Sequence, residues 1–135
     1  MSTTTESREA QYAREVAATI KGQVRWGTWG TLAARNFQAT TTKDGAAALR
    51  VDITILPFNA DGKRSSGART AWLTIALRAD RYDITVQHTR HGDKFGTKGL
   101  VTHAETRGVY ADQLNNALTA IDWDGPQPFN PRLWS

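Results

Sequence analysis

Three histidines are the first residues whose chemistry could support a metal site, because neutral imidazole is a common metal ligand. They are His88, His91 and His103. Two adjacent strands could bring them together, but residues 88 and 91 flank a strand end and a glycine-containing segment, which fixes no ligand geometry. No HExxH pattern accompanies them. We therefore expect ordinary polar or partly buried histidines, with no metal and no cofactor.

Carboxylates are the next candidates, since two of them can act as general acid and general base when their pKa values differ. Asp80 and Asp83 flank Tyr82, and Asp52 is expected to share a sheet face with Asp83. Arginines lie near all three carboxylates in the expected sheet. Ion pairing on a solvated face is therefore the expected role, and Asp80 has the residue type of a turn.

Serine and threonine are abundant, but none lies in a recognisable nucleophile motif. Ser65, Ser66 and Gly67 do not form the GxSxG turn of the α/β-hydrolases. The later glycines lack the spacing of a dinucleotide-binding loop, and the chain has no cysteine to act as a thiolate nucleophile. We therefore predict that the protein is not an enzyme.

Two basic segments that contain glycine are the strongest indication of function. Residues 63–69 and 90–98 are each expected to join two strands, so both can lie at one end of the sheet. Such loops bind phosphate through positive charge and backbone N–H groups, and aromatic side chains nearby can stack on bases. The predicted nucleic-acid-binding residues are Lys63, Arg64, Arg69, Trp72, Arg90, Lys94, Phe95 and Lys98.

The formal net charge of +4 agrees with a polyanionic partner, although such a charge also keeps an ordinary domain in solution. The prediction is single-stranded or non-sequence-specific binding, and it covers DNA and RNA alike. The other interpretation of the same residues is a set of solvated loops with Trp72 covered by the C-terminal tail.

Tryptophan content indicates a second possibility, because the chain has five. Trp26, Trp29, Trp123 and Trp134 lie outside the expected strands. Tryptophan is enriched at the energetic centres of interfaces, so an exposed cluster would bind a protein partner or a second copy of the chain. The alternative function is therefore a module that inhibits or recruits a host protein. A third possibility is that the protein is a structural virion component that assembles with itself. If the tryptophans instead lie buried under the helices and the tail, they have no binding role.

The strands that must position these residues follow from their periodicity. Residues 49–55, 71–77 and 82–88 each place apolar side chains on one face, as half-buried strands do. Residues 37–42 and 100–104 are two further strand candidates. The polar face of this sheet is expected to carry Arg50, Asp52, Thr54, Trp72, Thr74, Arg78, Asp83, Thr85 and Gln87.

Helical spacing of apolar residues predicts one helix from residue 6 to residue 21, with Gly22 as its stop, and another over residues 110–121. Residues 24–34 contain two glycines and favour a short helix or an irregular turn. The tail of residues 123–135 contains three prolines, and we expect it to be irregular.

Together these elements predict an α+β fold, with an antiparallel sheet of four to five strands and the N-terminal and C-terminal helices packed on one face. A length of 135 residues fits a single domain, with residues 2–6 frayed. No apolar run approaches the roughly 18–20 residues of a membrane span. The first residues lack a secretory signal pattern, so we predict a cytoplasmic protein with no membrane partner.

Three short segments follow one another in a characteristic order: Ala34-Arg-Asn-Phe37, residues 80–86 and residues 108–114. This order resembles a group of small uncharacterised proteins from tailed phages and related mobile elements. The resemblance covers roughly residues 16–121 and implies a phage or mobile-element accessory protein in the host cytoplasm. It implies no reaction and no functional residue. Trp26, Trp29 and the tail after Asp122 depart from it.

Overall fold

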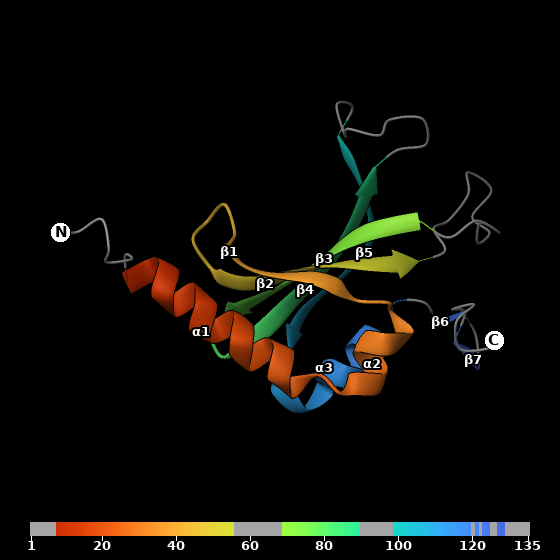
Figure 1. Ribbon diagram of the computed structural model, residues 1–135, viewed down its shortest axis with the longest axis horizontal. Coiled ribbons are helices and arrows are strands. Elements are labelled where there is room, and N and C mark those ends of the chain that lie inside the picture. The colour runs from red at the N-terminus through yellow and green to blue at the C-terminus, as the bar shows by residue number, and fades with distance from the viewer. Residues whose placement is uncertain are drawn as a thin grey trace.

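The computed structural model describes residues 8–55, 69–89, 99–119 and 121, and the backbone of residues 123–124 and 127–128. Five antiparallel strands form one sheet in the order β1-β2-β3-β4-β5, and the helices α1, α2 and α3 lie together on one side of it (Figure 1). The predicted α+β class, with an antiparallel sheet and helices on one face, is confirmed.

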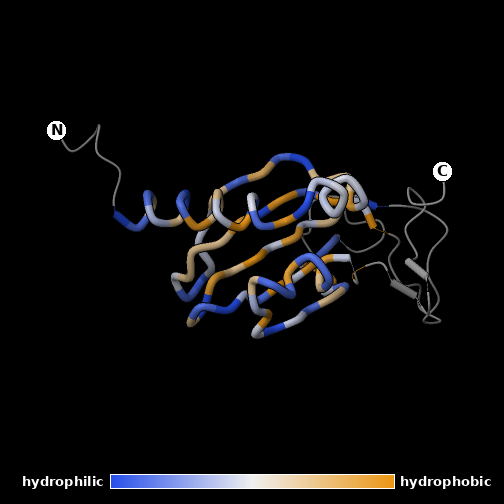
Figure 2. Tube along the Cα trace, turned by 90° about the horizontal axis from the view of Figure 1, so that it is seen from below, coloured by the Kyte–Doolittle hydropathy of each residue, from blue (hydrophilic) through white to orange (hydrophobic). Residues whose placement is uncertain are grey.

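The strands alternate between buried and accessible side chains, as their sequences predict, and Figure 2 shows the alternation of hydrophobic and hydrophilic positions along the chain. On the helix-covered face, Leu49 lies opposite Ile75, which lies opposite Ile84. Alternation is strict here because burying only one face fixes the register of each strand. The strands are β1 (Arg35–Thr41), β2 (Ala47–Ile55), β3 (Arg69–Arg78), β4 (Arg81–Thr89) and β5 (Leu100–Val109).

Strand β5 is longer than the five residues expected from its sequence. Its second half contains Glu105 and Arg107, and it has no apolar alternation. Two register shifts against β4 also interrupt it, and Gly108 has a positive φ of 69°. An edge strand with bulges and exposed side chains loses the period of two on which the prediction depended.

Helix α1 (Arg8–Gln23) ends one residue beyond Gly22, so the predicted stop at that glycine is wrong. The helix continues past Gly22 because a residue much later in the sequence, Asn115, bonds to the backbone at its end. Asn115 donates a 3.0 Å hydrogen bond to the backbone carbonyl of Gln23 and accepts a 2.7 Å hydrogen bond from the backbone N–H of Arg25. This side chain therefore satisfies backbone groups at the helix end without requiring glycine there.

The ambiguous segment of residues 24–34 contains a short helix, α2 (Trp26–Thr31), as favoured from its sequence. The C-terminal helix is shorter than predicted. It begins with a 3₁₀ turn, η2 (Ala111–Gln113), and continues as α3 (Leu114–Thr119). α3 packs against both α2 and β5, so helices from the N-terminal and C-terminal parts of the sequence lie side by side on one face of the sheet.

The hydrophobic core lies between the sheet and the helices, and the apolar faces of both layers enter it. Burying each Leu or Ile side chain contributes about 1.5–3 kcal/mol relative to exposing it, which makes this layer the main source of stability. Its largest fully buried members are Ile20, Leu32, Leu49, Ile53, Ile55, Leu73, Ile75, Leu114 and Leu118.

The tail is not wholly irregular, contrary to expectation. β6 (Trp123–Asp124) pairs with β7 (Gln127–Pro128) as a two-stranded antiparallel ladder. Proline lacks an N–H donor, but a ladder of two residue pairs tolerates it at a strand end. The expectation for residues 2–6 lies outside the described residues. Among the helices described, α1 is the longest at 16 residues and is largely polar, so none is suited to spanning a bilayer.

Candidate nucleic-acid interface

The sheet face opposite the helices is the candidate interface. All nine residues predicted on this face are exposed or half-buried, whereas the alternate residues of the same strands form the core. Register places them side by side: Arg50 lies opposite Thr74, and Trp72 lies opposite Gln87. A broad polar surface therefore runs across the middle three strands, and none of the described helices covers it.

Trp72 is the one aromatic residue on the open face of the middle strand, β3, and its side chain is half-buried. The guanidinium carbon of Arg50, from the neighbouring strand, lies 5.3 Å from the centroid of the Trp72 ring. This distance is typical of a cation–π interaction. The pair therefore presents a flat aromatic surface and a positive charge side by side. The predicted placement of Trp72 on the polar face is confirmed.

A second cation reaches the same region from β1. Arg35 donates a 3.0 Å hydrogen bond to the hydroxyl of Thr70, across the width of β2. Beside it, Asn36 donates a 2.8 Å hydrogen bond to a carboxylate oxygen of Asp52. Sequence reasoning missed Arg35 and Asn36, because the register shift after Arg35 removes the alternation that would assign them a face.

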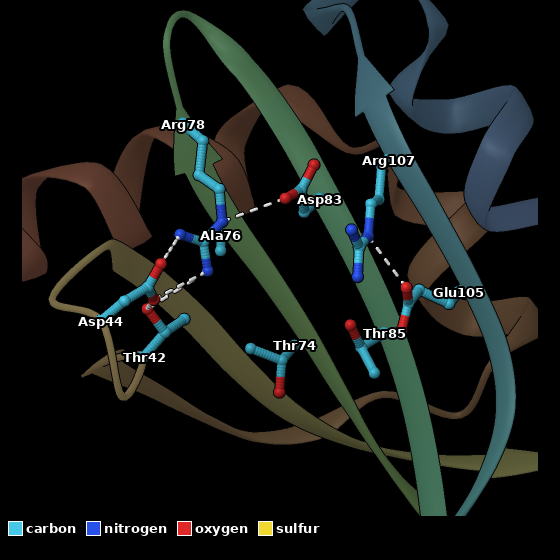
Figure 3. Close-up of a pocket in the computed structure, with 9 residues that line it drawn as sticks. All are labelled: Thr42, Asp44, Thr74, Ala76, Arg78, Asp83, Thr85, Glu105 and Arg107. Carbon is cyan, nitrogen blue, oxygen red and sulfur yellow. Dashed lines mark hydrogen bonds and ion pairs between the residues drawn. The ribbon is translucent and has the colours of Figure 1, made fainter.

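Arg78 lies at the opposite end of this face, between two carboxylates (Figure 3). It forms an ion pair with Asp44, and its Nε lies 3.0 Å from an oxygen of Asp83. Asp44 also accepts a hydrogen bond from the hydroxyl of Thr42. The hydrogen bonds from Arg78 and then Thr42 hold the pKa of the Asp44 carboxyl well below its ordinary value of 3.8. Asp44 in turn raises the pKa of Arg78.

Arg107 forms a further ion pair in the same neighbourhood, with its Nε 2.9 Å from an oxygen of Glu105. A hollow of about 370 Å³ lies between this pair and Arg78, floored by threonines of β3 and β4 (Figure 3). Three carboxylates thus accompany two arginines, so positive charge is cancelled at this end. The open face is therefore electrostatically uneven, with Arg35 and Arg50 near Trp72 at the other end.

The two predicted basic loops begin and end at the side of the sheet nearer Trp72. Ile55 pairs with Arg69 at the boundary of the first segment, and Thr89 pairs with Leu100 near the boundary of the second. Arg69 is half-buried and donates a 3.1 Å hydrogen bond to the hydroxyl of Thr89. The other predicted loop residues lie outside the described residues: Lys63, Arg64, Arg90, Lys94, Phe95 and Lys98.

The predicted tryptophan surface lies on the other side of the molecule. Trp26 has 92% of its surface exposed, and Trp29 packs edge-on against Phe37 with ring centroids 5.0 Å apart. The Nζ of Lys21 lies 4.4 Å from the Phe37 centroid. These residues line an apolar groove of about 670 Å³. Trp123 is described only through its backbone and Trp134 lies outside the described residues, so the groove brings together two of the four predicted tryptophans.

The histidines do not assemble into a site within the part of the chain that is described. His88 is buried, and its Nδ1 lies 2.8 Å from the carbonyl oxygen of Thr89. Its ring centroid is 6.4 Å from that of His103, which is half-buried. His91 lies outside the described residues, and those that are described contain no group of three potential metal ligands.

Comparisons of this chain with protein families, with curated protein sequences and with solved structures found no match. The resemblance to phage and mobile-element accessory proteins therefore stays a prediction.

Proposed function

We propose that the open sheet face binds single-stranded nucleic acid. The observation that carries the proposal is Trp72, accessible on the middle strand with the Arg50 guanidinium 5.3 Å from its ring centroid. In this proposal a base stacks on Trp72, and phosphates contact Arg50 and Arg35 on the open face and Arg69 at the end of β3. The remaining contacts come from the basic segments that join the strands: Lys63, Arg64, Arg90, Lys94, Phe95 and Lys98.

Stacking favours a single strand, because the bases of a duplex are already stacked on one another and present only their edges. The uneven charge of the face supports the same position. At one end, Arg35 and Arg50 outnumber the single carboxylate Asp52, which favours phosphates there. At the other end, the two arginines are outnumbered by three carboxylates, Asp44, Asp83 and Glu105. The strand ends that lead into both basic segments lie beside the favourable end.

The test is the affinity of fluorescently labelled oligonucleotides, measured by anisotropy for the wild type and for Trp72→Leu. Loss of one stacked base costs roughly 1–3 kcal/mol, so we expect binding about 5-fold to 150-fold weaker. Trp26→Leu is the matched control, because it removes an exposed tryptophan from the opposite side of the molecule. A labelled oligonucleotide is preferable to intrinsic fluorescence, since five tryptophans contribute to that signal.

Two results would overturn the proposal. One is wild-type protein that binds neither single-stranded DNA nor single-stranded RNA at low salt. The other is an affinity that falls equally for Trp72→Leu and Trp26→Leu, which would remove the argument for stacking on the open face. Equal affinity for duplex and single strand, with no effect of Trp72→Leu, would mean that phosphate attraction alone accounts for binding.

Protein binding through the apolar groove is the second proposed function, and the exposure of Trp26 favours it. A tryptophan exposed to 92% beside an apolar groove is the kind of feature that marks an interface. A host protein bound there would depend on Trp26 and little on salt concentration. A pull-down in which Trp26→Leu retains the same host protein as the wild type would contradict this alternative.

The resemblance of three short segments supports a non-enzymatic role as a phage or mobile-element accessory protein, and either proposed activity suits such a role. Expression of the chain in a bacterial host offers a test. Nucleic-acid crosslinking in those cells should recover bound single strands from the wild type and fewer from Trp72→Leu.

A further inference from the structure

The two edges of the sheet differ in how well they are protected. Within the described residues, β1 has a neighbouring strand on one side only, and so does β5. β5 carries Glu105 and Arg107 and has two register shifts, which are features that discourage pairing with another strand. Residues 38–41 of β1 pair regularly with β2 and contain no charge and no proline. The β1 edge is therefore the one suited to accept a further strand.

The backbone groups of β1 that face outward can be identified from its hydrogen bonds. The N–H of Thr42 donates to the carbonyl of Ala46 over 2.9 Å, so Thr42 directs this N–H towards the strand that contains Ala46, as one half of a hydrogen-bonded pair does. In an antiparallel ladder such pairs alternate, which makes Thr40 the next residue bonded to β2. Ala39 and Thr41 therefore direct their N–H and C=O groups away from β2.

We propose that β1 pairs in antiparallel fashion with β1 of a second copy of this chain, about a two-fold axis that passes midway between the two copies of Ala39. Ala39 then lies opposite Ala39 of the partner subunit, and Gln38 lies opposite the partner's Thr40. An axis perpendicular to the sheet keeps both open faces on one side and both helix layers on the other. The two sheets become one sheet of ten strands.

The surface beside β1 has the self-complementarity that a two-fold interface requires. A groove of about 710 Å³ runs between α1 and β1, and Glu9 and Arg14 both line it. Two antiparallel copies of α1 bring Glu9 of one copy towards Arg14 of the partner subunit, and the reverse pair forms by symmetry. Ala10 and Ala13 also line the groove, and their small side chains allow the helices to approach closely.

Sedimentation velocity of the full chain without nucleic acid tests the proposal, independently of the proposed binding function. We expect a concentration-dependent dimer for the wild type and a monomer for Ala39→Pro. Proline removes an N–H that faces outward, so the pairing of β1 with β2 is retained, and circular dichroism should confirm a folded chain. Wild-type protein that remains monomeric at about 100 μM would overturn the proposal.

Charge reversal provides a second test that leaves the backbone unchanged. Glu9→Lys alone and Arg14→Glu alone each place two like-charge pairs in the dimer, and we expect about tenfold weaker association. The double variant Glu9→Lys/Arg14→Glu should restore the wild-type dissociation constant. Glu15→Lys is the control, because it makes the same charge change on α1 at a residue that does not line the groove. A double variant that associates no better than the singles, or a folded Ala39→Pro dimer, would contradict this interface.

Discussion

The hydroxyl of Tyr82 donates a 2.7 Å hydrogen bond to the side-chain oxygen of Gln23, 59 residues earlier in the chain. Gln23 is the last residue of α1, and Tyr82 lies near the start of β4 with its ring buried in the core. The bond therefore ties the helix layer to the β3–β4 hairpin at the margin of the core. Burial raises the pKa of the Tyr82 hydroxyl above its ordinary value of 10.0.

Tyr82→Phe tests the contribution of this bond. We expect the free energy of unfolding to fall by about 1 kcal/mol, the usual net contribution of one hydrogen bond, because the ring keeps its packing. Urea denaturation of the wild type, Tyr82→Phe, Gln23→Ala and the double variant would isolate the pairwise term. Strict additivity of the two single changes would show that the bond contributes nothing.

The same residue predicts a pH effect at the alkaline end. Because the folded pKa of Tyr82 lies above the unfolded value, the stability linked to it is fully present below about pH 10 and is lost as the pH rises through the folded pKa. Unfolding of the wild type should therefore become easier above about pH 10, and Tyr82→Phe should show a weaker dependence. Identical pH profiles for the two proteins would exclude Tyr82 as the titrating group.

The β3–β4 turn contains avoidable strain. Ala79 and Asp80 both have positive φ, 50° and 64°, in a two-residue loop between the paired residues Arg78 and Arg81. This is the conformation of a type I′ turn, in which asparagine and glycine are favoured. Ala79→Asn should stabilise the protein by about 0.5–1 kcal/mol, since asparagine tolerates the left-handed region better than alanine. Ala79→Val should destabilise it, and a shift of both thermal midpoints in the same direction would refute the argument.

Most of the sheet could be predicted from the sequence because its central strands are buried on one face only. Leu49, Ile75 and Ile84 reveal their common face through a period of two. The end of α1 could not be predicted, because the residue that satisfies the carbonyl group of Gln23 is Asn115, 92 residues away. The length of β5 was also hidden, since an exposed edge strand with register shifts has no regular apolar pattern.

The residues on the candidate interface could be predicted only where they lie on strands with a regular alternation of apolar and polar residues. The proximity of Trp72 and Arg50 follows from the pairing of two alternating strands. The pairing of Arg78 with Asp44 does not, since Asp44 lies in a turn 34 residues away and local sequence carries no sign of that distance. Arg35 was missed because it precedes a register shift. Side-chain contacts that turns and bulges make with distant strands therefore could not be predicted from the periodicity of apolar residues.

Acid should weaken the fold through Asp44. Hydrogen bonds from Arg78 and Thr42 lower the folded pKa of this carboxyl, so the stability linked to it is present above its unfolded value of 3.8 and is lost as the pH falls below that value. The difference between the urea midpoints of the wild type and Asp44→Asn should be largest at about pH 5 and should narrow steadily as the pH falls from about 4 towards about 2. Glu15→Gln, on an exposed face of α1, controls for the general effect of removing a carboxylate. A constant gap across this range would mean that Asp44 is not the group responsible.

The basic segments should determine the salt dependence of nucleic-acid binding. The triple variant Lys63→Ala/Lys94→Ala/Lys98→Ala should bind all single-stranded sequences more weakly and by similar factors, because phosphate contacts carry no base information. If each lysine contacts one phosphate, the slope of log affinity against log salt should become shallower by about 2. Lys43→Ala is the matched control, since Lys43 follows β1 at the opposite end of the sheet from Ile55 and Arg69. A triple variant with the wild-type slope would confine binding to the open face. If net charge alone causes the attraction, the single change Lys43→Ala will reduce the slope by about a third of the triple variant's change.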